Sequence, residues 1–179
     1  IGSEDPGVSD VVTWRVGDKW VYSGAFDPTV LVQGAGVDAV VGKIIGDATT
    51  TVEGVAEVDI DGVQTLVYLT SSKADFDKGG VALEGYTGNL YIQYQVDEVR
   101  RVSDLAKLST DLSLNVRYVP YGISSLTQQI ADITITTTYD PMSENYDFPL
   151  RIGETWNASY VSSTSWSGSS DYITPFPQP

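Results

Sequence analysis

The segment TTTVEGVAEVDIDGVQTLVYLTSS, residues 49–72, gives the clearest indication of the fold. Polar and apolar residues alternate on both sides of Asp61-Gly62, a pair that favours a two-residue hairpin turn. One face carries Val52, Gly54, Ala56, Val58 and Ile60 before the turn, and Val63, Thr65, Val67 and Leu69 after it. We therefore predict an antiparallel β-hairpin.

The same alternation returns in residues 89–97, 112–118 and 133–139. In the first of these, Leu90, Ile92 and Tyr94 alternate with polar neighbours, as in a strand with one buried face. Five or six strands joined by short turns predict a mainly β protein. Its sheet is expected to be antiparallel and curved, either in a sandwich or as a half-barrel.

Two segments depart from this rhythm and predict one or two short helices. Residues 36–46 place apolar side chains at helical spacing and end at Gly46, a plausible C-cap, although their β-branched content argues for a strand. Residues 103–108 start with Ser103 as a candidate N-cap and predict one or two helical turns.

At 179 residues, one domain is the default expectation. We predict a single β-rich domain over residues 1–158, followed by a Ser/Thr/Pro-rich segment, residues 159–179, that is either a tail or an added strand. Solvated linkers seldom carry so many large aromatic residues. We therefore predict assembly contacts for all four, Tyr160, Trp166, Tyr172 and Phe176.

The formal net charge of -14 makes nucleic acid and anionic membrane surfaces poor partners. No window approaches the run of about 18 apolar residues that a membrane span needs, so membrane insertion is not expected. A chain that opens at Ile1 fits a processed secreted protein, and a trimmed chain equally well. In a secreted protein, Asn157 of the Asn-Ala-Ser sequon is a candidate for an N-linked glycan.

The residue types available for catalysis are few, because the chain contains neither Cys nor His. That removes thiolate nucleophiles, imidazole bases and the usual zinc ligands. Carboxylate pairs remain, as does the Ser103/Lys107 pair, but no motif singles any of them out. The chain is therefore not expected to be an enzyme.

A weak calcium candidate lies at Asp75 and Asp77, two residues apart before Gly79-Gly80. An EF-hand loop would need Glu at its twelfth position, which is Tyr86 here. The alternative is an ordinary solvated turn, and no other cofactor is expected.

Residues 14–20, WRVGDKW, return in altered form as residues 150–156, LRIGETW. Each copy has the chemistry of a Gly-acid turn that leads into a strand. The four tryptophans, Trp14, Trp20, Trp156 and Trp166, present two alternatives: a platform on which sugar rings stack, or the filled end of a β core.

The segments VGDKWVY (residues 16–22), TYDP (138–141) and FPLRIGETW (148–156), with SDLA (103–106), resemble secreted and cell-surface β domains of archaea, notably methanogens. The resemblance spans most of residues 14–156. It implies an exported envelope component and no catalytic residues.

These observations lead to two functional hypotheses. The first is a structural subunit of an archaeal extracellular sheath, surface layer or filament, a self-assembling homopolymer joined through a strand edge or the tail. The alternative is a secreted binding module that holds a lipid or a glycan in a half-barrel. A carboxylate hydrolase ranks last.

Overall fold

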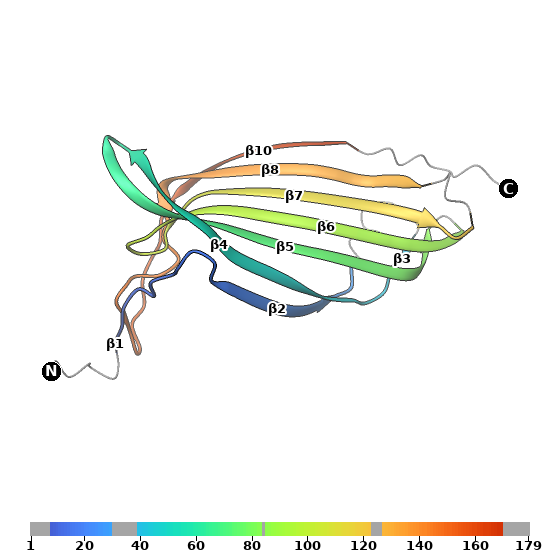
Figure 1. Ribbon diagram of the computed structural model, residues 1–179, viewed down its shortest axis with the longest axis horizontal. Helices are drawn as coiled ribbons and strands as arrows, with labels where there is room; N and C mark the ends of the chain where they lie inside the picture. The colour runs from blue at the N-terminus through green and yellow to red at the C-terminus, as the bar shows by residue number, and fades with distance from the viewer. Residues whose placement is uncertain (1–7, 30–38, 84, 123–126, 170–179) are drawn as a thin grey trace.

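The chain folds into one large antiparallel sheet that does not close into a barrel (Figure 1). The computed structural model describes residues 8–29, 39–83, 85–122 and 127–169, and within these ranges it has essentially no helix. The strands are β1 (Val8–Ser9), β2 (Lys19–Phe26), β3 (Ala39–Val40), β4 (Ile44–Ile60), β5 (Val63–Leu83), β6 (Tyr86–Arg101), β7 (Lys107–Pro120), β8 (Gln128–Ser143), β9 (Leu150–Arg151) and β10 (Val161–Ser169).

The strand order in the main sheet is β10-β8-β7-β6-β5-β4-β2, and β3 adds to β5. Every neighbouring pair is antiparallel, as short connections between long strands require. The small pair β1/β9 lies beyond one end of the sheet (Figure 1). The prediction of a mainly β, antiparallel fold is confirmed.

The predicted hairpin is confirmed as β4 and β5, and both strands are longer than the sequence pattern indicated. Ile60 pairs with Val63, and the two turn residues have positive φ, 54° at Asp61 and 82° at Gly62. This is the turn geometry that matches the twist of hairpin strands. A β-bulge between Val52 and Gly54 then shifts the register within the hairpin.

Both predicted helices are wrong for the residues described. In the segment 36–46, residues 39–40 form β3 and Ile44 begins β4, whereas residues 36–38 lie outside the described ranges. Gly42, with φ of 70°, changes the direction of the chain between the two-residue strand β3 and the long strand β4. Val41 and Ile44 are buried while Val40 and Ile45 are exposed, so β pairing overrides the helical spacing.

Residues 103–106 form a turn instead of a helix, and β7 begins at Lys107. The amide of Leu105 donates to the carbonyl of Arg101, but Leu105 has a φ of 60°, which a right-handed helix cannot contain. The Asp104 carboxylate accepts the amide of Ala106 and pairs with Arg101, which holds the turn.

The two tryptophan turns, residues 15–18 and 151–154, have the same local structure. In each, the fourth residue donates its amide to the carbonyl of Arg15 or Arg151, at 2.9 and 3.2 Å, and the third residue is a glycine with φ of 93° or 82°. The first turn leads directly into β2. The second does not open a strand, because residues 154–160 form no regular structure and β10 begins at Val161.

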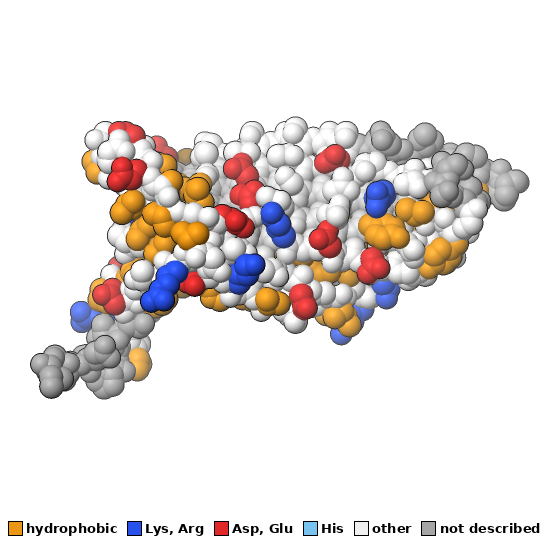
Figure 2. Space-filling view, viewed as in Figure 1, with side chains coloured by type: hydrophobic (Ala, Val, Ile, Leu, Met, Phe, Trp, Pro, Cys, Tyr) orange, Lys and Arg blue, Asp and Glu red, His pale blue; other side chains and the backbone are white. Residues whose placement is uncertain are grey.

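Alternation gives the sheet two different faces. One, the polar face, carries charged, amide and hydroxyl side chains across the middle strands, and Figure 2 shows acidic and basic groups scattered over the broad side of the sheet with few hydrophobic ones at its centre. The other, the apolar face, is formed by Tyr22, Ala48, Phe76, Ile92, Tyr94, Leu112, Leu114, Val116, Ile133 and Ile135.

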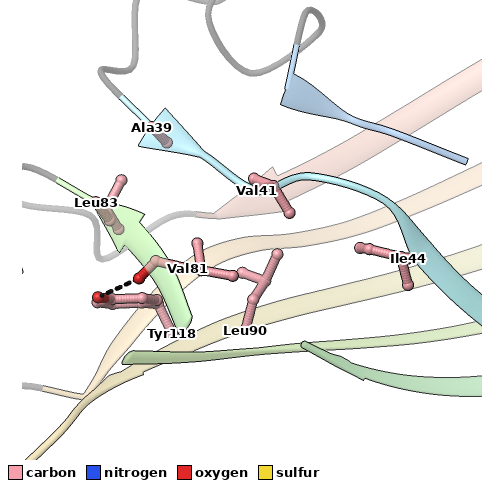
Figure 3. Close-up of a cluster of buried hydrophobic side chains, with 7 residues drawn as sticks. All are labelled: Ala39, Val41, Ile44, Val81, Leu83, Leu90 and Tyr118. Carbon is pink, nitrogen blue, oxygen red and sulfur yellow. Dashed lines mark hydrogen bonds between the residues drawn. The ribbon is translucent and has the colours of Figure 1, made fainter. Parts of the chain in front are cut away.

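Two separate core clusters cover the ends of the apolar face. The first contains Ala39, Val41, Ile44, Val81, Leu83, Leu90 and Tyr118 (Figure 3). The second contains Val52, Tyr68 and Leu105, with Trp14, Trp20 and Phe148 packed against them. Ile44 and Val52 lie eight residues apart on β4, so the clusters are separated by about 26 Å along the strand.

Candidate functional site

In the described parts of the chain, no second layer of strands covers the middle of the apolar face between the two clusters. Among the described strands, contacts run only between neighbours in the same sheet. Apolar side chains that a sandwich would bury against a second sheet therefore line surface hollows. Three such hollows follow one another along this face.

The first, the tryptophan hollow, has a volume of about 520 Å³ and combines aromatic with polar side chains. The rings of Trp14 and Trp20 are 5.1 Å apart and those of Trp14 and Tyr68 are 5.3 Å apart, between centroids. The Trp14 amide also donates to the Tyr68 hydroxyl at 3.1 Å. The lining residues are Val12, Trp14, Trp20, Tyr22, Thr50, Thr70, Ser72, Glu98, Arg100, Leu105, Tyr146, Phe148 and Leu150.

A nearly buried charged group lies at this hollow. Arg100 Nη2 lies 2.7 Å from Glu98 Oε2, and Lys107 Nζ lies 2.7 Å from Glu98 Oε1. Burial by itself raises the pKa of Glu98, but the hydrogen bond from Lys107 and the charge of Arg100 outweigh it, so the pKa is lowered. Glu98 is thus held as a carboxylate with both oxygens occupied by cations.

The second hollow, the central trough, has a volume of about 450 Å³. It lies between β2 and β7, and Phe76 stacks on Tyr94 within it at 6.3 Å. Its lining residues are Tyr22, Ser23, Gly24, Ala25, Gly46, Ala48, Phe76, Ile92, Tyr94, Leu112 and Leu114. Tyr22 also lines the tryptophan hollow, so the two adjoin.

The third, the end hollow, has a volume of about 290 Å³ and reaches the first core cluster. Ile92 and Leu114 line both it and the central trough. Among the described residues, no charged side chain lines either of these two hollows. The apolar face therefore changes from aromatic and polar at one end to wholly apolar at the other.

Asp75 and Asp77 lie on strand β5, on the polar face, and not in a loop. They pair with Gln93 and Tyr91 of β6, and the Gln93 amide donates to Asp75 Oδ1 at 2.7 Å. The expected glycine turn is absent because Gly79 and Gly80 form an irregularity inside β5. Within the described ranges, no three Asp, Glu, His or Cys residues come together in a way that could hold a metal ion.

The residues predicted for modification and assembly lie near the C-terminal end of the described chain. Asn157 is exposed in the irregular segment 154–160, where a glycan has access. Tyr160 is 46% exposed and packs edge-on against Tyr139 at 5.5 Å. Trp166 is 75% exposed on β10, and Tyr172 and Phe176 lie outside the described residues.

Strand β10 forms one edge of the main sheet, and β2 forms the other. Its nine residues, VSSTSWSGS, include no charged residue and no proline, and all are exposed. They pair with β8 in one unbroken register from Val161–Asp140 to Ser169–Asp132. The structure thus shows residues 161–169 as a strand that pairs within its own sheet.

Sequence reasoning identified parts of these features and missed others. Of the four tryptophans, the structure brings Trp14 and Trp20 together, whereas Trp156 and Trp166 are exposed elsewhere. The alternation did place Ile92, Tyr94, Leu112 and Leu114 on the apolar faces of their strands, but in the structure they are half-buried and line a hollow. The group of Glu98, Arg100 and Lys107 was missed, since strand alternation alone does not reveal which charged residues meet across a pair.

Among the described residues, helices long and apolar enough to span a membrane are not found. Comparisons with protein-family models, with curated proteins and with solved structures returned no match.

Proposed function

We propose that this chain is a structural subunit of an extracellular archaeal assembly, a sheath, surface layer or filament, and that copies join through the open edge of the main sheet. The observation that carries the proposal is strand β10. Its outer side presents the backbone N–H and C=O groups of alternate residues to another strand.

Soluble proteins protect their edge strands with lysine, proline, bulges or very short strands. Residues 161–169 show none of these features. The nine-residue register is long and regular, and Ser and Thr side chains are small enough to let a second strand approach. Trp166 adds a large exposed ring on the apolar side of the same strand.

The direction of the strands selects the symmetry of the contact. Six antiparallel steps separate β2 from β10, so these two edge strands run parallel to each other. Joining β10 of one copy to β2 of the next without rotation would create a parallel pair, which is less stable per residue. Two β10 strands related by a two-fold axis pair antiparallel and keep both apolar faces on the same side.

Two-fold contacts at β10 and at β2 in alternation would extend the sheet without limit, as a filament or a layer requires. The charge of -14 opposes the approach of copies, and salt screens this repulsion. Assembly is therefore expected to strengthen with ionic strength. Secretion and a glycan at exposed Asn157 belong to the same proposal, which assigns no enzymatic activity.

The test compares Ser165→Lys with Ser113→Lys. Ser165 is the middle residue of β10, so a lysine there faces its own copy across the two-fold axis. Each such like-charge contact costs about 0.2–1 kcal/mol. Ser113 is exposed on the same polar face but lies on the interior strand β7, which makes it the matched control.

Light scattering and negative-stain electron microscopy at rising salt concentration would give the outcome. We expect the unsubstituted chain and Ser113→Lys to associate and Ser165→Lys to stay smaller. A chain that remains monomeric at all salt concentrations, or a Ser165→Lys variant that associates as well as the control, contradicts the proposal.

The hollow apolar face favours a second candidate function, a binding module for a lipid or a glycan. No second layer of the described strands covers this face, and its half-buried apolar side chains line a trough of the kind that binds ligands. Native mass spectrometry of the purified chain tests this candidate: a co-purifying ligand supports it, and a ligand-free chain that binds no amphiphile contradicts it.

A further inference from the structure

We infer that the apolar face binds one amphiphile in a fixed direction, with a neutral, hydroxyl-bearing head of the sugar type in the tryptophan hollow and an aliphatic tail along the central trough and the end hollow. This inference rests on the second candidate function, the binding module, and is independent of the edge contact.

The tail position follows from the lining of the central trough. Ala25, Ala48, Phe76, Ile92 and Leu114 present hydrocarbon, and the hollow continues past Ile92 into the end hollow. A polar ligand would lose hydrogen bonds to water there without replacing them. An aliphatic chain has no hydrogen bonds to water to lose, and it gains free energy by burying apolar area.

The head position follows from the different chemistry of the tryptophan hollow. Flat rings of Trp14 and Trp20 meet hydroxyl groups there, including Thr50 Oγ1 and Ser72 Oγ, which lie 2.7 Å apart. Sugar rings present an apolar face that packs on aromatic rings and hydroxyls that exchange hydrogen bonds with Thr and Ser. A purely aliphatic ligand would leave this end unused.

The charges present favour a neutral head over an anionic one. Arg100 already donates from Nε and Nη2 to Glu98 and from Nη1 to the Leu105 carbonyl, and Lys107 is paired with the same carboxylate. These cations are largely committed within the protein. The overall charge of -14 also repels an anionic amphiphile as it approaches.

The direction of the ligand is set by the strands beneath it. On β6, Arg100 lies at the tryptophan hollow, Ile92 at the central trough and Leu90 at the end hollow. Arg100 and Leu90 are ten residues apart, about 33 Å along a strand. This change from polar to apolar along the strand matches the two ends of an amphiphile.

Titration calorimetry with dodecyl maltoside, below its micelle concentration, tests the inference. Sodium dodecanoate and dodecyltrimethylammonium share its tail, and free maltose shares its head. We expect the maltoside to bind at least about tenfold more tightly than any of the three. Decyl maltoside should bind about fifteenfold more weakly than dodecyl maltoside, because it has two fewer methylenes and each buried methylene contributes about fourfold.

Variants locate the two ends of the ligand. Leu114→Asp places a charge in the trough and should abolish binding, whereas Ser113→Asp, the adjacent residue on the polar face, should not change it. Ala48→Phe fills the same trough without a charge, in case Leu114→Asp fails to fold. For the head, Tyr146→Ala should weaken maltoside binding about tenfold but leave dodecanoate binding unchanged. Tyr160→Ala, with similar exposure, is its control.

Equal binding of all three dodecyl compounds, lost in Leu114→Asp and Ala48→Phe, would overturn the sugar-type head while leaving the binding module intact. Failure of every compound to bind would overturn both. Neither outcome bears on the assembly contact at β10, which is measured by association of copies.

Discussion

Replacing Tyr118 with Phe tests whether the core cluster at the end hollow is organised as described. The Tyr118 side chain is 0% exposed, and its hydroxyl donates to the backbone carbonyls of Tyr86, at 2.8 Å, and Val81, at 3.2 Å. Tyr118→Phe keeps the ring and removes the donor. Leaving buried carbonyls without this partner should lower the free energy of unfolding by about 1–2 kcal/mol at neutral pH.

The difference in unfolding free energy between the two proteins should depend on pH, and this dependence tests the burial of the hydroxyl more specifically than the size of the difference does. Burial, with a smaller contribution from the charge of Tyr121, raises the pKa of Tyr118 from 10.0 to about 12. A raised pKa in the folded state means that its stabilising contribution is complete below pH 10 and is lost as the pH rises toward 12. A pKa shift of two units corresponds to about 2.7 kcal/mol of stabilisation of the folded state, and about half of this stabilisation is lost by pH 11.

Urea unfolding of both proteins at pH 8, 10 and 11 measures the difference. At pH 8 the midpoint of Tyr118→Phe should lie about 0.5–1 M below that of the unsubstituted chain. The two midpoints should converge near pH 11. Tyr146→Phe, which removes an exposed hydroxyl, controls for the change in tyrosine number and should show a small difference at pH 8. A gap for Tyr118→Phe that stays constant from pH 8 to 11 would refute the burial and bonding of this hydroxyl.

Three further predictions concern the trough, the charged group and the tryptophan turns. Gly46→Ala would bring a Cβ to within 2.1 Å of the Phe76 ring and should lower the free energy of unfolding by about 1–3 kcal/mol. Gly24 pairs with Gly46 across the strands, and a Cβ there would meet nothing within 4 Å, so Gly24→Ala is the control. Equal effects of the two substitutions in chemical denaturation would contradict the packing. Glu98→Gln leaves two nearly buried cations without a charged partner and should lower the free energy of unfolding by about 2–3 kcal/mol at pH 7. Because the pKa of Glu98 is lowered, the penalty should shrink as the pH falls below the ordinary glutamate range, and a pH-independent penalty would argue against the pairing. Both Gly17 and Gly153 have positive φ, so alanine strains the backbone at either position. Only the Gly17 amide donates to β4, to the Val52 carbonyl at 2.8 Å, so Gly17→Ala should lower the melting temperature more than Gly153→Ala. The opposite ranking in thermal unfolding would contradict this expectation.

Much of the sheet could be predicted from residue patterns because strand alternation is a local property. The hairpin at Asp61-Gly62 and the strands around residues 89–97, 112–118 and 133–139 all appear in the structure. Their lengths were underestimated, since polar residues such as Asp75 and Asp111 continue strands whose polar face lies in water.

The helix predictions failed where a local period competed with pairing partners that are remote in sequence. Residues 39–40 pair with residues 82–83 of β5, and this pairing outweighs the helical spacing of Val37, Val40 and Val41. In residues 103–106, the ion pair between Arg101 and Asp104 closes a turn between two long strands, which leaves no room for a helix.

The class of fold, the turns and the residues that share a face could be predicted from the sequence alone. These depend on neighbours along the chain, as the two copies of the tryptophan turn show by adopting the same geometry in different surroundings. The tertiary structure was needed to show that no described strand forms a second layer on the apolar face, that Trp14 and Trp20 meet at one end of it, and that β10 forms an edge of the sheet. Those features depend on which strands lie side by side and what remains uncovered, and no local pattern carries that information.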